Sequence, residues 1–211
     1  MKKVILMTTI ALSSALASAQ GLYVGAGIGY TSLDLDTKGV ESDLVVSNGG
    51  SASASADSSV NGYRLVVGYE INKIYAVELG YLKTNTYGVT VNGVAGNSAI
   101  YNIGLRAEVS GFDVSVLAKP FDSGSMSNVF FQLGVSNYKQ KGTVISSVVG
   151  GATNQESFSE SGIGTNLGFG YDLEVSKGLD ARFGVTRVFK LAGESGDNVT
   201  NYSVGLIKRF D

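Results

Sequence analysis

The sequence predicts an all-β chain: an eight-stranded antiparallel up-and-down transmembrane β-barrel with a filled polar interior and an apolar, lipid-facing exterior. Along most of the chain, apolar side chains alternate with small or polar ones, which is the period-two pattern of strands. Charged residues make up only 16% of the chain, and it has 29 glycines but a single proline. Short and long connections alternate between the strands, as they do in membrane barrels.

The N-terminal residues have the pattern of a cleavable export signal. Two lysines precede a short apolar run over residues 4–16, and an A-x-A cleavage site follows it. The run is shorter than the roughly 20 residues that a membrane-spanning helix needs. We therefore predict a signal peptide over residues 1–19, cleavage between Ala19 and Gln20, and one barrel domain over residues 20–211.

The first predicted strand, GLYVGAGIGYTSLDL at residues 21–35, shows the alternation most clearly. Glycine occupies positions 21, 25, 27 and 29, and apolar side chains stand between the last three. A dinucleotide-binding loop needs G-x-G-x-x-G before a helix, but Tyr30 stands at the third glycine position and no helical period follows. We therefore interpret the segment as a strand with one face of very small residues.

The second and third strands repeat this arrangement. In GYRLVVGYEI (62–71) and YAVELGYL (75–82), aromatic and aliphatic side chains share one face, and glycine with isolated charges shares the other. The link between them, at Asn72 and Lys73, is short. It predicts a tight antiparallel hairpin.

Residues 98–121 leave two interpretations open. From Ile100 to Val109 the apolar residues fall on odd positions, whereas from Phe112 onward they fall on even positions. A β-bulge at Ser110-Gly111 would insert one residue and reset the faces, which gives one long strand. A two-residue hairpin there would give nine strands, an odd number that suits closed bacterial barrels badly. We prefer the bulged strand.

The remaining strands are expected at residues 129–136, 162–175, 179–185 and 201–211, each with the same two-faced alternation. Three longer connections, at residues 36–59, 84–98 and 140–160, are rich in Ser, Gly and Asn. Because they alternate with short links, we expect them at one end of the barrel as extracellular loops.

The composition of the polar face decides which side is inside. In a soluble barrel that face would point to water, where glycine weakens a strand without benefit. An eight-stranded barrel has an interior only wide enough for side chains, so inward-facing glycine makes room for charges. Tyrosines near the strand ends fit an interfacial aromatic belt. The predicted interior charge network comprises Arg64, Glu70, Glu78, Arg106, Glu108, Asp113, Lys119, Asp172, Glu174, Asp180, Arg182 and Arg209.

The last segment carries a family resemblance. SVGLIKRF, residues 203–210, resembles the closing strand of the OmpA-like and porin-like, opacity-type small outer-membrane barrels of Gram-negative cells. The resemblance implies an assembly signal that the outer-membrane insertion machinery reads, and contact with outer-membrane lipid and lipopolysaccharide. Lys208 replaces the usual aromatic residue, and Asp211 follows the usual terminal Phe. The residues expected to form the signal are Tyr202, Gly205, Leu206 and Phe210.

The residue inventory argues against several functions. The chain has neither histidine nor cysteine, which excludes His-assisted nucleophilic catalysis, and we expect no catalytic residue, metal site or cofactor. DLDTKG at residues 34–39 only begins like a calcium loop, because Lys38 occupies a ligand position. With 16 basic and 18 acidic residues, the chain is no basic nucleic-acid binder.

Two functional hypotheses remain. The first is a structural or surface-interaction barrel of the adhesion type, whose extracellular loops meet a host or cell-surface ligand. The alternative is a narrow porin-like channel for passive diffusion of water, ions or small solutes. Paired interior charges favour the first hypothesis, because they would block a pore of this width.

Overall fold

The computed structural model describes residues 21–33, 38, 41–42, 45, 50–57, 59–193 and 198–210. The predicted signal peptide, its cleavage site at Ala19 and Gln20, and Asp211 lie outside these residues. The described part of the chain contains no helix with the length and apolar character needed to cross a membrane.

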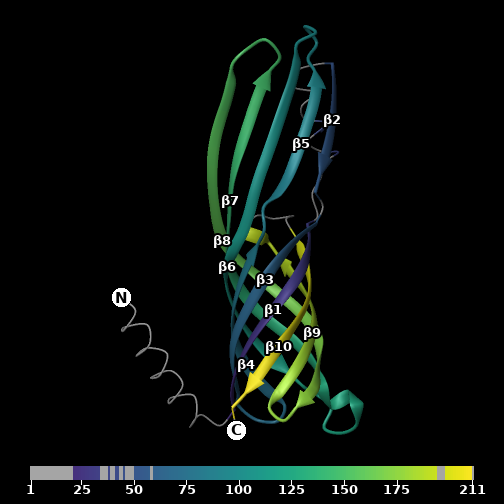
Figure 1. Cartoon of the computed structure of the whole chain (residues 1–211), viewed down its shortest axis with the longest axis vertical. Helices are drawn as coiled ribbons and strands as arrows, with labels where there is room; N and C mark the ends of the chain where they lie inside the picture. The colour runs from purple at the N-terminus through teal and green to yellow at the C-terminus, as the bar shows by residue number, and fades with distance from the viewer. Residues whose placement is uncertain are drawn as a thin grey trace, which may run out of the picture.

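Eight of the strands close an antiparallel barrel, as the sequence predicted (Figure 1). Each strand pairs with the next around the wall, and the last returns to the first, so that the ring has no open edge. In order around the wall they are β1 (Leu22–Leu33), β3 (Ser59–Glu70), β4 (Tyr75–Thr84), β6 (Ile100–Ala118), β7 (Val129–Val148), β8 (Thr153–Ser176), β9 (Leu179–Phe189) and β10 (Val199–Arg209).

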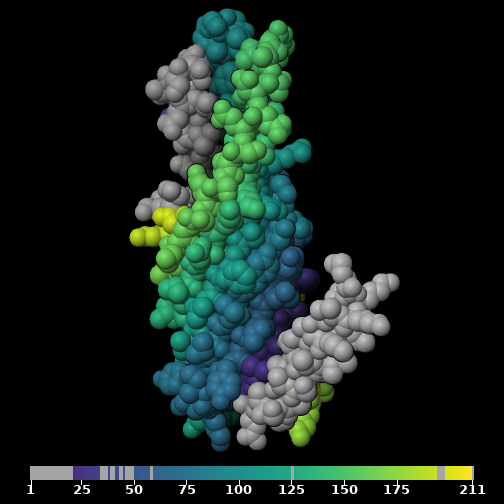
Figure 2. Space-filling model, turned by 90° about the vertical axis from the view of Figure 1, so that its left-hand side faces the viewer, coloured from purple at the N-terminus to yellow at the C-terminus, as the bar shows by residue number. Residues whose placement is uncertain are grey.

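Part of the sheet continues above the barrel. β2 (Ser51–Ala56) pairs with β5 (Tyr87–Val94), and β5 pairs with the first half of β6. Together with the facing halves of β7 and β8 they form what we call the protruding sheet (Figure 1). In the space-filling view the β7–β8 and β5–β6 turns make up its far end (Figure 2).

The protruding sheet corrects the expectation of long loops. Strands occupy residues 51–56, 87–94 and most of 140–160, where irregular connections were expected. These segments do alternate, as in SASASA and YGVTVNGV, but their polar or small side chains suggested loops. Strand pairing satisfies the hydrogen-bonding groups of their backbone. Their polar composition therefore reflects a sheet that is surrounded by water, not an irregular backbone.

β6 is one continuous strand, and the expected bulge at Ser110-Gly111 is wrong. The β6–β7 register runs without a shift from the Tyr101–Val148 pair to the Ala118–Phe131 pair. Odd-numbered side chains of β6 therefore face the same side over the whole length. No inserted residue resets the faces.

The apparent change of parity in β6 is a change of environment. Below Ser110, on the side of the short turns, the inward-facing Asp113 is buried and the outward-facing Val114 is 49% exposed. Above Ser110 the order inverts, because Ala107 is buried whereas Arg106 points outward and is exposed. The outer face thus passes from apolar to polar at one level of the wall. We infer that this level is the boundary between lipid and water.

The interior changes character along the barrel axis. One hydrophobic cluster closes the end that adjoins the protruding sheet, and a second, smaller one lies in the other half of the barrel. Polar and charged side chains fill the space around and between them. The first cluster comprises Leu33, Val60, Leu82, Tyr87, Ala107, Val109, Tyr138, Val188, Leu191 and Val199.

The seam between β1 and β10 depends on two facing glycines. Gly27 pairs with Gly205 in the register, and a Cβ added to Gly205 would lie 2.7 Å from the Ala26 carbonyl oxygen and 2.9 Å from the Gly27 Cα. These are backbone atoms, so they can move away only by distorting the wall. The glycine that the sequence assigned to the assembly signal therefore has a packing role at the closing seam.

We expect Gly205→Ala to lower the free energy of unfolding by about 1–3 kcal/mol, the usual range for overpacking. Urea unfolding of the refolded protein in detergent, followed by circular dichroism, measures this difference. Gly104→Ala is the matched control, because a Cβ at Gly104 would have no atom within 4 Å. Equal stability of the two variants would contradict a steric role for the seam.

Candidate functional site

The barrel interior holds three groups of charges, of which the first two share Asp172. The first group lies at the short-turn end and centres on Arg209 of β10. Its Nε donates to Asp180 Oδ2 at 2.6 Å, its Nη2 donates to Asp172 Oδ2 at 2.9 Å, and Nη1 donates to Glu70. Lys119 Nζ lies 3.2 Å from Asp172 Oδ2. Four strands and the end of β6 are therefore tied together through one guanidinium and its neighbours.

The second group surrounds Arg182 of β9. Its Nε donates to Asp172 Oδ1 at 2.7 Å, and its Nη1 donates to Glu78 of β4 on the other side of the barrel. The Tyr23 hydroxyl also donates to Glu78, at 2.8 Å. The guanidinium lies over the Phe130 ring, 4.7 Å from its centroid. Aromatic rings thus stabilise the cation that spans the interior.

The third group is a bidentate pair between Arg64 of β3 and Asp113 of β6. The two hydrogen bonds measure 2.7 and 2.6 Å, and the Tyr138 hydroxyl donates to the same carboxylate at 3.0 Å. Bidentate guanidinium–carboxylate pairs are among the strongest polar contacts in proteins. Ser115 and Gln132 continue the network: the Gln132 amide donates to the Ser115 hydroxyl at 2.9 Å.

These groups leave little space inside the barrel. The cavity that borders Arg64, Glu78 and Arg182 has a volume of about 50 Å³. That is room for a few waters at most, not for a solute. Above it, the first hydrophobic cluster fills the barrel mouth beneath the protruding sheet.

Three residues of the predicted network lie elsewhere. Arg106 and Glu108 point outward from β6 above the boundary, and Glu108 lies 3.6 Å from Lys83 on that outer surface. Glu174 has the inward parity of β8 but is exposed near the short-turn end. The error at Arg106 and Glu108 does not come from the expected bulge. Both residues were assigned to the interior because polar side chains were expected to face inward along the whole strand.

Several polar members of the network were missed by the sequence analysis. Tyr23 and Gln132 both occupy inward parity positions, so the alternation alone pointed to them. The predicted network contained charged side chains only. Buried hydroxyl and amide groups are needed to pair with the hydrogen-bond acceptors and donors that the carboxylates and guanidinium groups leave unused.

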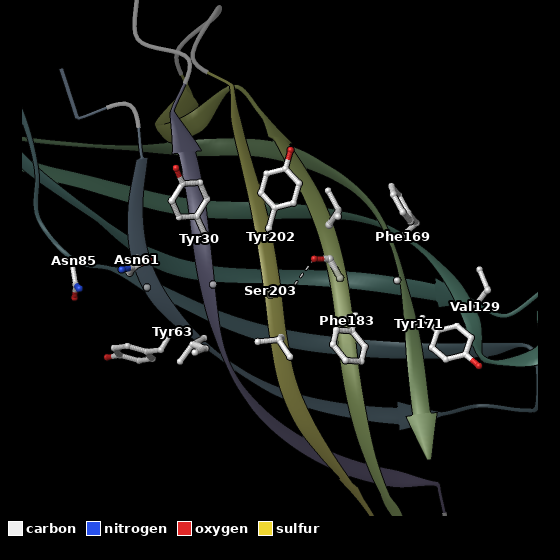
Figure 3. Close-up of a pocket in the computed structure, with 17 residues that line it drawn as sticks. Tyr30, Asn61, Tyr63, Asn85, Val129, Phe169, Tyr171, Phe183, Tyr202 and Ser203 are labelled. Atoms are coloured by element: carbon white, nitrogen blue, oxygen red, sulfur yellow. Dashed lines mark hydrogen bonds between the residues drawn. The ribbon is translucent and has the colours of Figure 1, made fainter. Parts of the chain in front are cut away.

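A wide depression lies on the outer wall of the barrel. It has a volume of about 1020 Å³ and runs over several neighbouring strands on both sides of the β1–β10 seam. Figure 3 shows Tyr30 and Tyr202 side by side at one end of it, with Phe183 and Tyr171 farther along the wall. These side chains are outward-facing, so the depression offers an apolar surface to lipid chains.

The assembly-signal residues lie together on or beside β10. Tyr202 and Leu206 point outward and are 51% and 54% exposed, whereas Gly205 points inward at the seam. The Phe210 backbone N–H donates to the Leu22 carbonyl at 2.9 Å, which extends the seam past the end of the strand. Lys208 shares the outward face near the short-turn end, where a lysine costs little in a bilayer.

The comparisons with known proteins agree with this geometry. The model of the outer membrane protein beta-barrel domain family matches residues 4–210. No curated protein sequence matches the chain. The fold is similar to the crystal structure of Ail, the attachment invasion locus protein of Yersinia pestis, with a TM-score of 0.56, 13% identity, and coverage of 90% of this chain and 99% of that one.

A second structure of Ail, in complex with the heparin analogue sucrose octasulfate, is also similar. Its TM-score is 0.50 at 14% identity, and the match covers 90% of this chain and 99% of that one. At such low identity the likeness concerns the fold alone. The resemblance drawn from the closing strand, to small outer-membrane barrels, is confirmed.

Proposed function

Because the chain belongs to the outer membrane protein β-barrel domain family, we propose that it is a surface-interaction barrel whose protruding sheet contacts ligands outside the cell. The barrel anchors the chain in the outer membrane, and the sheet carries the contact surface. The export signal over residues 1–19, reading of the closing strand by the insertion machinery, and contact with lipopolysaccharide are parts of the same proposal.

The single observation that carries this proposal is the contrast between the two halves of the molecule. The barrel half is filled by paired charges and a hydrophobic cluster, with a residual cavity of about 50 Å³. The other half is a paired sheet that continues some of the wall strands beyond the barrel (Figures 1 and 2). A rigid sheet held away from the membrane is suited to binding, because its side chains are presented without an ordering cost.

Lipopolysaccharide contact is supported by basic residues at the boundary level. Lys83, Lys139 and Lys141 lie on the outward faces of β4 and β7 near or just above that level. Cations there can pair with the phosphates of outer-leaflet lipids while their stems lie along the apolar wall.

One observation favours the channel alternative. Polar groups of Arg64, Glu78, Gln132 and Arg182 border the small cavity, so a water molecule there would find hydrogen-bond partners. A continuous path for water or ions through the barrel would require both the charge groups and the first hydrophobic cluster to rearrange. We therefore keep the narrow pore as the second candidate.

Conductance separates the two candidates. We expect refolded protein in a planar bilayer to show no stable single-channel current, while a heat-shifted gel band proves that the barrel has folded. Stable conductance that changes ion selectivity on charge reversal at Glu78 would support the channel instead.

Cells that display the protein should lose surface attachment when the β7–β8 hairpin is shortened to the boundary level, with the gel shift retained.

A further inference from the structure

The outward face of the protruding sheet contains a hollow. Its volume is about 510 Å³, and it spreads over β2, β5, β6 and β7. Strand pairing aligns its floor in one row across the sheet, from Ser55 through Thr90 and Gly104 to Ile145. The hollow therefore rests on four hydrogen-bonded strands instead of on a loop.

Glycine makes the hollow deep. Gly104 sits inside β6, where glycine weakens a strand, yet a Cβ there would meet no atom within 4 Å. Close approach of another described residue therefore does not explain why position 104 is a glycine. Gly88, on the adjacent strand, has only ordinary contacts: its Cβ would lie 3.5 Å from the Asp57 carboxylate and 3.6 Å from the Leu105 carbonyl oxygen.

Two opposite charges flank this glycine floor. Gly88 pairs with Arg106 in the β5–β6 register, and the Asp57 backbone N–H donates to the Gly88 carbonyl at 2.8 Å. Both charged side chains are exposed. Within the part of the chain that the structure describes, neither the carboxylate nor the guanidinium makes an ion pair or a side-chain hydrogen bond. As far as the described residues are concerned, both are therefore available to a ligand.

The remaining groups are uncharged. Ser55, Thr90, Asn102 and Ser147 supply hydroxyl and amide groups, and the Ile145 side chain supplies an apolar edge. Such a set can donate to and accept from several hydroxyls at once, while glycine and isoleucine lie against the C–H face of a ring.

We propose that this hollow binds an uncharged saccharide, with Asp57 accepting from sugar hydroxyls and Arg106 donating to them. The inference rests on the proposed surface-interaction function and names the ligand class and the site. One carboxylate beside one guanidinium leaves no net charge in the hollow, so a polyanion would face Asp57 without enough cations to offset the repulsion. The hollow is thus unlike a site for a sulfated polysaccharide.

The test measures binding of neutral oligosaccharides of glucose, galactose, mannose and N-acetylglucosamine to the whole protein, with heparin as the anionic probe. The protein is held in a zwitterionic detergent, because glucoside or maltoside headgroups would compete. Gly104→Val fills the floor with a residue that strands favour, and no atom within 4 Å opposes it. Ser159→Val, on the outward face of β8, is the control for a new apolar group outside the hollow.

We expect at least one neutral probe to bind, Gly104→Val to abolish binding, and Arg106→Gln to weaken it about tenfold, as the loss of a charge-assisted hydrogen bond would. Ser159→Val should bind like the native protein. Heparin binding that Arg106→Gln removes, or binding of an extended peptide in place of sugars, would overturn the saccharide assignment. If no neutral probe binds but displayed protein still attaches cells, the hollow inference fails and the proposed function stands. If attachment is also absent, both fail.

Discussion

Arg64→Met should destabilise the barrel by about 3–5 kcal/mol, the cost of breaking a buried ion pair from one side. The substitution removes both hydrogen bonds to Asp113, whose side chain has no exposed surface. The carboxylate would then keep only its contacts with neutral hydroxyls such as that of Tyr138. Urea unfolding in detergent, monitored by circular dichroism and by the heat-shifted gel band, gives the free-energy difference.

Lys83→Met provides the control for loss of a cation. The Lys83 side chain is 39% exposed, its partner Glu108 is 36% exposed, and their charged atoms lie 3.6 Å apart. Exposed pairs of this kind contribute about 0–1 kcal/mol. Adding Asp113→Leu to Arg64→Met should recover much of the lost stability, because no unpaired charge then remains inside. If Arg64→Met and Lys83→Met cost the same, the interior pair does not hold the barrel together.

The second large effect concerns the boundary level of the wall. Val114→Lys should cost about 2–4 kcal/mol, because it places a charge on the lipid side midway between Ser110 and the end of β6. Asn102→Lys, on the same face of the same strand, should change the stability by less than about 0.5 kcal/mol, as surface substitutions usually do. The measurement is unfolding of the protein in lipid bilayers, where the outer solvent differs between the two positions.

A second strand makes this test independent of β6. Leu133 is 64% exposed on the outward face of β7, and Thr143 lies on that face above the boundary. Leu133→Lys should match the loss at Val114, and Thr143→Lys should match Asn102→Lys. Equal costs above and below Ser110 would mean that the parity change in β6 does not mark the edge of the membrane.

The alternation in the sequence was sufficient to predict the barrel, its eight wall strands and the inward direction of the glycine face. In β1, for example, Tyr23, Gly25 and Gly27 share the inward parity that the opening segment suggested. The period of two is a local property of the extended backbone, so it can be read without knowing which strands are neighbours.

The protruding sheet could not be predicted in the same way. An alternating segment shows that two faces differ, but it does not say which face is inside. In β6 the apolar face is inward above Ser110 and outward below it, because water replaces lipid as the outer solvent. The sequence analysis expected polar side chains to face inward along the whole of this strand. That expectation led to a bulge that does not exist and placed Arg106 and Glu108 in the interior.

By itself the sequence determined the eight wall strands, the closed wall and the pool of charges available to the interior, since all of these follow from local period and composition. Only the tertiary structure decided which charges meet: Arg182 pairs with Glu78 across 104 residues of chain, and Arg209 with Glu70 across 139. Closure of the β1–β10 seam and the register of each strand pair bring such distant groups together. Register is a property of two strands, so no single segment encodes it.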